Sequence, residues 1–184
     1  MPLLRDILWS SIEDEGFEHL RLLQEGNRII ADGVVVRRDE ESAYRAAYRI
    51  ECDETWRIHR VEVTTADGAQ LELQSDGDGH WHDRPDLDGC HDVDIEASPF
   101  TNTLAIRRLA LAPGASQEIA VVFVTPGDDG AQRMMQRYTR ISEDRYLYES
   151  MESDFKAELP VDGDGLLLEY PNWFRRVWGV TESR

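Results

Sequence analysis

Lysine is almost absent from this chain. Lys156 is the only lysine among 20 basic residues, and 37 acidic residues leave a formal net charge of −17. A surface this acidic repels phosphate backbones and anionic membrane faces, so we expect no nucleic-acid partner. Two explanations of the composition stay open: adaptation to a salty cytoplasm, and codon usage that favours arginine.

Cysteines and long apolar runs are also scarce. Cys52 and Cys90 are too few for a disulfide framework. The longest apolar stretches, such as 120–124, are far shorter than the ~20 residues of a membrane helix. The opening Met-Pro-Leu-Leu-Arg-Asp lacks the basic and apolar regions of a signal peptide. We therefore expect a cytoplasmic protein with reduced thiols and no integral membrane segment, folded as a single domain, 1–184.

Apolar and polar residues alternate with a period of two along most of the chain. In 44–53, Tyr48 and Ile50 share one face while Arg49 and Glu51 share the other, as in a half-buried strand. Turn-forming links such as Glu25-Gly26-Asn27 favour hairpins. The predicted strands cover 17–24, 28–37, 44–53, 56–65, 69–74, 117–125, 133–141, 145–151, 154–161 and 166–170.

This pattern predicts a mainly β fold, in which a single curved antiparallel sheet of about ten strands forms an open or unclosed β-barrel with few short helices. The segment 98–108 is compatible with a short helix or a strand, and 171–178 with one amphipathic helix. Bulky rings that also carry hydroxyls, such as Tyr48 and Tyr148, suit a cavity with polar groups at its wall. Packing of the same tyrosines in a closed core is the alternative.

Polar groups concentrate in the segment 88–109, ahead of two adjacent arginines. Asp92 and Asp94 share a face if the chain is extended there. Together with Asn102 and the guanidinium of Arg107 or Arg108, they offer the groups that bind a polar head group. A structural ion pair between an arginine and a buried carboxylate remains an equal alternative.

Residues capable of catalysis or metal binding also occur here. Cys90 beside His91 suggests a nucleophile and its base, but adjacent residues of a strand point to opposite sides, and a buried structural cysteine is the commoner case. The acids and histidines between positions 80 and 94 show neither a CxxC pair nor an HExxH helix. We predict no catalytic residue, metal or cofactor.

Several motifs resemble the putative glycolipid-binding family of bacterial proteins, in the family's order and over nearly the whole chain. The most specific is Thr-Asn-Thr-Leu-x-Ile-Arg-Arg-Leu at 101–109. Others are 7–9, 16–18, 31–35, 48–50, 52–53, 56–57, 79–81, 89–94, 136–139, 146–148 and 165–171. The resemblance implies a curved, unclosed antiparallel barrel similar to that of lipid carriers of bacterial envelopes, and a glycolipid ligand.

The leading hypothesis is therefore a binding protein for a glycolipid or other amphipathic small molecule. An apolar chain would lie against the concave face, with a polar head near 88–109. The candidate ligand-binding residues are Asp92, Asp94, Asn102, Arg107, Arg108, Tyr48, Tyr138 and Tyr148. Two alternatives stay open: a small-molecule enzyme using Cys90, His91, Asp92 and Asp94, and a non-catalytic subunit whose concave face binds a protein partner. The sequence does not determine the oligomeric state.

Overall fold

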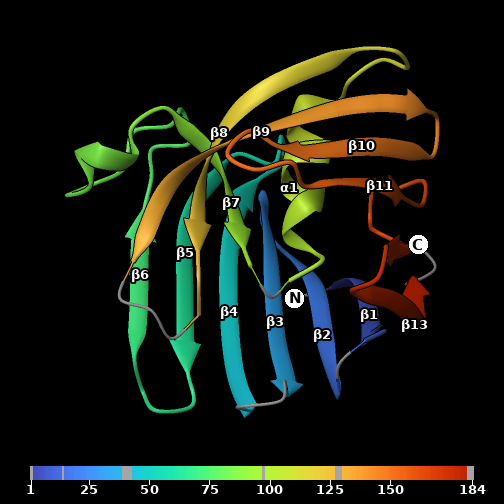
Figure 1. Ribbon diagram of the computed structural model, residues 1–184. Coiled ribbons are helices and arrows are strands. Elements are labelled where there is room, and N and C mark those ends of the chain that lie inside the picture. The colour runs from blue at the N-terminus through green and yellow to red at the C-terminus, as the bar shows by residue number, and fades with distance from the viewer. Residues whose placement is uncertain (1, 14, 39–42, 97, 127–129, 182–184) are drawn as a thin grey trace.

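The computed structural model describes residues 2–13, 15–38, 43–96, 98–126 and 130–181 (Figure 1). Strands dominate it, with a single α-helix and one 3-10 turn in the described ranges. The strands are β1 (Leu3–Ser11), β2 (Glu15–Glu25), β3 (Arg28–Arg38), β4 (Ala43–Asp53), β5 (Ile58–Thr65), β6 (Gln70–Gln74), β7 (Cys90–Ile95), β8 (Ser116–Val124), β9 (Ala131–Ser142), β10 (Arg145–Ser150), β11 (Lys156–Pro160), β12 (Glu169–Tyr170) and β13 (Phe174–Thr181). The helix α1 covers Thr101–Leu109, and the 3-10 turn η1 covers Pro85–Leu87.

The fold class predicted from the alternating pattern is confirmed. An eight-stranded antiparallel sheet runs in the order β12-β13-β1-β2-β3-β4-β5-β6 and does not close into a barrel. The structure adds a second, five-stranded sheet in the order β11-β10-β9-β8-β7, which crosses the first (Figure 1). In this second sheet β7 pairs with β8 in parallel, a pairing that a simple meander does not contain.

The inner faces of the two sheets form one hydrophobic core. Trp9, Ile50 and Val61 of the large sheet and Val93 and Val122 of the small sheet are all at most 1% exposed. The concave face of the large sheet is therefore filled with side chains over most of its area, because the second sheet and α1 cover it.

The helix α1 links β7 to β8, both in the small sheet, and the residue before it contacts the large sheet. Residues 101–106 are all buried, which requires protein on every side of that segment. Thr101 donates a hydrogen bond to Asp94 on β7, and Asn102 accepts one from Tyr138 on β9. Phe100, just before the helix, stacks on Tyr48 of β4 with ring centroids 6.2 Å apart. Of the two conformations compatible with 98–108, the helix is the one observed.

The prediction of a helix over 171–178 is wrong. Asn172 has a φ of 68°, a left-handed conformation that interrupts any right-handed helix. The chain then forms β13, which pairs with β1 along most of its length, for example Leu8 with Trp178. Without this pairing the backbone groups of β1 on that side would form a free edge, so tertiary pairing overrides the local amphipathic pattern. No helix in the described ranges is both long and apolar enough to cross a membrane.

Candidate ligand-binding site

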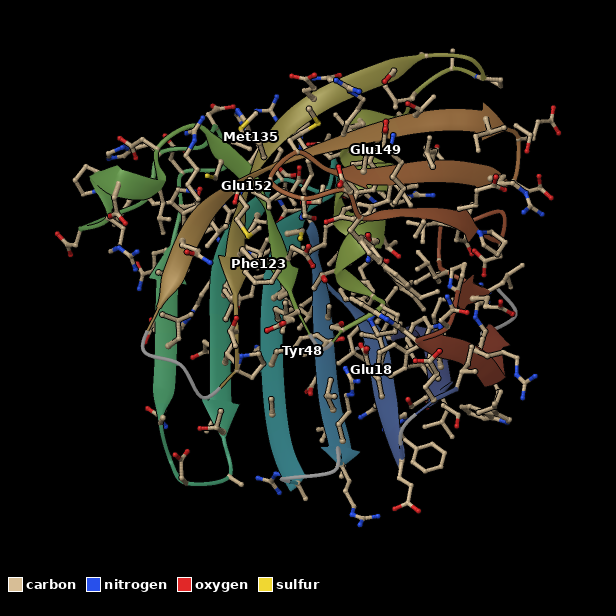
Figure 2. All side chains as sticks on the ribbon, in the orientation of Figure 1. Glu18, Tyr48, Phe123, Met135, Glu149 and Glu152 are labelled. Carbon is tan, nitrogen blue, oxygen red and sulfur yellow. The ribbon has the colours of Figure 1, made fainter. Side chains whose placement is uncertain are left out.

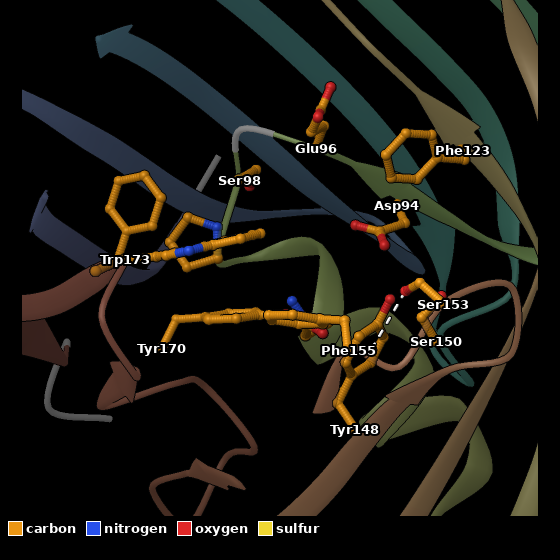
Figure 3. Close-up of a pocket in the computed structure, with 13 residues that line it drawn as sticks. Asp94, Glu96, Ser98, Phe123, Tyr148, Ser150, Ser153, Phe155, Tyr170 and Trp173 are labelled. Carbon is orange, nitrogen blue, oxygen red and sulfur yellow. Dashed lines mark hydrogen bonds between the residues drawn. The ribbon is translucent and has the colours of Figure 1, made fainter. Parts of the chain in front are cut away.

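A cavity of about 150 Å³ opens where β7, the start of α1 and the C-terminal segment meet (Figure 3). We call it the aromatic pocket. Its aromatic lining residues are Phe123, Tyr148, Phe155, Tyr170, Trp173 and Phe174, and its other lining residues are Asp94, Glu96, Ser98, Pro99, Asn102, Ser150 and Ser153. A cavity of about 150 Å³ accepts a benzene-sized molecule, so this one has room for a single six-membered ring.

One wall of the aromatic pocket is a continuous stack of rings. Trp173 lies 5.1 Å from Tyr170 and 5.2 Å from Phe155, with interplanar angles of 10° and 21°. Tyr148 meets Phe155 edge to face at 6.0 Å. These residues come from β10, the β10–β11 connection, β12 and the turn before β13, so only the folded chain brings them together. Such a wall offers flat apolar faces beside polar groups.

The opposite side of the aromatic pocket is polar. Asp94 accepts hydrogen bonds from Thr101 at 3.1 Å and from the side-chain amide of Gln136 at 2.6 Å. Burial raises the pKa of the Asp94 carboxyl; hydrogen bonds from Gln136 and Thr101 oppose the shift, and the charge of Glu96 adds to it. Figure 3 shows the carboxyl directed toward the end of Tyr148. Burial, followed by the Asp94 charge, raises the pKa of the Tyr148 hydroxyl, which therefore stays protonated and able to donate.

A buried carboxyl, that of Glu18 on β2, lies behind the aromatic pocket. Its Oε1 accepts hydrogen bonds from the Tyr48 hydroxyl at 2.5 Å and from the Ser98 hydroxyl at 2.8 Å, and Ser98 also lines the pocket. Its Oε2 is buried without a hydrogen-bond partner among the described residues. Burial raises the pKa of Glu18 from 4.5 to about 8, although the hydrogen bonds from Tyr48 and Ser98 act in the opposite direction. Figure 2 labels Glu18 and Tyr48 on the large sheet.

Three of the predicted ligand-binding residues meet in the aromatic pocket: Asp94, Asn102 and Tyr148 all line it. Tyr138 lies directly behind, because its hydroxyl donates to Asn102 Oδ1 at 2.9 Å and its ring contacts Tyr148 edge to face at 5.5 Å. Tyr138 therefore orients the amide rather than lining the cavity.

The other predicted ligand-binding residues lie elsewhere. Asp92, 1% exposed, is bound by Arg108 through two hydrogen bonds of 2.9 and 2.6 Å, so the structural ion pair considered from the sequence is present. Arg107 points outward, with its guanidinium 5.2 Å from the Trp56 ring, and borders a separate open depression of about 770 Å³. Tyr48 binds Glu18. A ligand-binding role for these four predicted residues stays a prediction.

Cys90 and His91, two residues of the enzyme hypothesis, do not form a nucleophile–base pair. Cys90 is buried while His91 is exposed, as expected for neighbours on a strand. Burial raises the pKa of the Cys90 thiol to about 11, which keeps it protonated and weakly nucleophilic at neutral pH. Within the described ranges, no three His, Cys, Asp or Glu side chains are arranged to hold a metal ion.

The sequence interpretation missed Glu18 and two rings of the stacked wall, Tyr170 and Trp173. Glu18 alternates in phase with Leu20 and Leu22, which are buried, so its inward direction could have been found from the period of two. Tyr170 and Trp173 show no such signal, because Tyr170 ends the two-residue strand β12 and Trp173 lies in the turn before β13.

Comparisons with known proteins agree with this architecture. Residues 6–176 match the family described as Putative glycolipid-binding. The chain is also similar to the crystal structure of a DUF1089 family protein from Pseudomonas aeruginosa, with 39% sequence identity and a TM-score of 0.77. That similarity covers 88% of this chain and 92% of the other. No curated protein matches the chain. Because the family match spans almost the whole sequence, the chain belongs to the Putative glycolipid-binding family.

Proposed function

We propose that this protein binds a glycolipid without altering it chemically, and that the sugar ring occupies the aromatic pocket. The observation that carries the proposal is the coincidence of a ring-sized cavity with a stacked aromatic wall and a polar wall. A pyranose has flat C–H faces and a rim of hydroxyls. The Trp173 side of the pocket suits the faces, while Asn102 and Asp94 suit the hydroxyls. The family description supports the same ligand class.

The acyl part of such a ligand does not fit inside the aromatic pocket together with a ring. It also has little space along the concave face, where residues such as Ile50 and Val61 are fully buried. In this proposal the acyl chain leaves through the mouth of the pocket, past Trp173, which is 38% exposed. Ile12 is 47% exposed and donates its backbone N–H to the Trp173 carbonyl, so a second exposed apolar residue is the backbone neighbour of Trp173.

Binding of an alkyl glycoside tests the proposal. Octyl glucoside, titrated below its micellar concentration and followed by calorimetry, should saturate one site. Trp173→Leu should weaken that binding by about tenfold or more, because it removes a stacking face. Trp178→Leu is the matched control: Trp178 is 48% exposed on β13 and does not line the aromatic pocket, so affinity should be unchanged.

Native mass spectrometry of the purified protein adds an independent measurement. A co-purifying lipid of defined mass supports the proposal. Equal effects of the Trp173 and Trp178 substitutions, or the absence of saturable binding, would contradict it. A bound metal would instead favour the enzyme hypothesis, and a stable oligomer with no ligand would favour the partner-binding subunit.

A further inference from the structure

Among the described residues that line the aromatic pocket, two are acidic and none is basic. The acidic side chains are Asp94 and Glu96, and none of the residues that the structure shows lining the pocket is lysine, arginine or histidine. The two carboxyl groups interact: burial is the main cause of the raised pKa of Asp94, and the charge of Glu96 adds to it. An anionic ligand would add a third negative group to this pocket.

Asp94 differs from the neighbouring inward-facing acid on the same strand. Asp92 is neutralised by Arg108, whose guanidinium nitrogens lie 2.9 and 2.6 Å from the two carboxylate oxygens. For Asp94, the described residues supply only neutral donors, one to each oxygen: the amide of Gln136 and the hydroxyl of Thr101, whose single proton is shared with the Ser98 carbonyl. The protein thus orients the Asp94 carboxylate with two hydrogen bonds and leaves it without a protein cation on the side facing the cavity.

The stacked wall favours positive charge as well. The faces of aromatic rings carry partial negative charge and attract cations, with tryptophan the strongest. Trp173 is the outermost ring of the wall and retains 38% exposure. Carboxylates on one side and aromatic faces on the other form a pocket in which an ammonium group is stabilised from both directions.

We propose that the head group bound in the aromatic pocket is an amine-bearing sugar ring, with its ammonium group paired to Asp94 and Glu96. This inference rests on the proposed function and specifies its ligand class. The ring satisfies the size of the cavity and the stacked wall, and the amine satisfies the pair of carboxylates. Neutral sugars bind the same pocket more weakly, and sugars that carry a carboxylate or phosphate are rejected by charge repulsion.

Matched octyl glycosides separate these possibilities. The probes are the octyl glycosides of glucose, of 2-amino-2-deoxyglucose and of glucuronic acid, each titrated by calorimetry at pH 7. We expect the amine to bind roughly ten- to a hundredfold more tightly than the neutral glycoside, the range given by hydrogen bonds to charged groups. The glucuronide should bind most weakly. Octyltrimethylammonium, a cation without a ring, should bind more weakly than the amino glycoside.

Substitutions assign the charge preference to its residues. Asp94→Asn should remove most of the advantage of the amine over the neutral glycoside, and Glu96→Gln should reduce that advantage less, because Glu96 is exposed. Glu158→Gln changes the net charge of the protein by the same amount at an exposed position of β11 outside the pocket, and should leave the preference intact.

The outcomes distinguish the two proposals. Equal affinities for the three glycosides, or an unchanged preference in Asp94→Asn, would overturn the charge inference while leaving glycolipid binding in place. Tighter binding of octyltrimethylammonium than of the amino glycoside would overturn the sugar ring. Absence of binding by all three glycosides would overturn the proposed function and this inference together.

Discussion

The buried Glu18 should make folding stability depend on pH in a direction opposite to that of most carboxylates. In the folded protein burial raises the pKa of Glu18 to about 8, whereas the reference value is 4.5. Between these two values the unfolded chain has released the proton and the folded chain retains it. The folded state then binds more protons, so the free energy of unfolding falls as the pH rises from about 4.5 to about 8.

The size of the effect follows from the width of this window. One pKa unit corresponds to about 1.4 kcal/mol, so the full shift amounts to a loss of the order of 5 kcal/mol between the two ends. This is a large part of the ~5–15 kcal/mol that a typical domain has in total. Because Glu18 is fully buried, solvent and salt screen the effect very little.

Glu18→Gln isolates this contribution. The glutamine carbonyl can accept the hydrogen bonds from Tyr48 and Ser98, but the side chain cannot ionise. Urea unfolding at pH 5, 6, 7, 8 and 9 should show that the stability of the variant relative to wild type increases with pH and levels off above pH 8. Glu15→Gln, at an exposed position of the same strand, removes one negative charge without touching the buried carboxyl and serves as the control. A difference between Glu18→Gln and wild type that is flat across this range would refute the reasoning.

Three further predictions test the interior. Arg108→Ala should lower the free energy of unfolding by about 3–5 kcal/mol, because it leaves the buried Asp92 carboxylate without its partner. The control Arg107→Ala, at an exposed side chain, should lower it far less in the same urea titration. Equal losses would contradict a stabilising role of the Arg108–Asp92 ion pair. Gly33→Ala should lower the free energy of unfolding by about 1–3 kcal/mol and alter the near-UV circular dichroism, since a Cβ there would overlap the Tyr48 ring on the adjacent strand. A variant as stable as wild type would show that this ring moves freely. Cys52 and Cys90 should react with a thiol reagent only as fast as the protein unfolds, because both are buried and burial raises the pKa of each thiol; rapid reaction of the native protein would place a thiol at the surface.

Many strands of the large sheet could be predicted because the pattern that marks each of them lies within its own sequence. Strands such as β2, β3 and β4 are buried on one face, so apolar and polar residues alternate along them. The turns between β2 and β3 and between β5 and β6 contain Gly26 and Gly68, which adopt the positive φ that these turns require. The division into two sheets was not predictable in this way. The large sheet ends at β6, and β7 joins the small sheet by pairing in parallel with β8 across the intervening α1. Pairing between strands separated in this way leaves no periodic pattern in the local sequence.

The same difference between local patterns and long-range contacts decides which parts of the candidate site could be predicted. Asp94 and Asn102 could be identified because polar side chains are concentrated within a few positions, and folding keeps such neighbours close. The stacked wall could not, because Phe155, Tyr170 and Trp173 are brought together only after the chain leaves β11 and returns as β13. The wrong prediction of a helix over 171–178 also concealed the position of Trp173. The turn before β13 places this side chain over Tyr170, whereas a helix would have directed it elsewhere.

The three acids Glu18, Asp92 and Asp94 show how differently one interior can accommodate a carboxyl group. Burial of an ionised carboxylate is strongly unfavourable unless it is neutralised or paired. Glu18 is accommodated by retaining its proton, and Asp92 by the two-pronged contact with Arg108. Burial raises the pKa of Asp94 as well, but the described residues give it no cation, and two neutral groups hold its oxygens in place toward a cavity. An oriented carboxylate that faces a ring-sized space is the arrangement expected where the missing cation belongs to a ligand, and this is why the charge of the ligand, rather than its lipid chain, is the property to measure first.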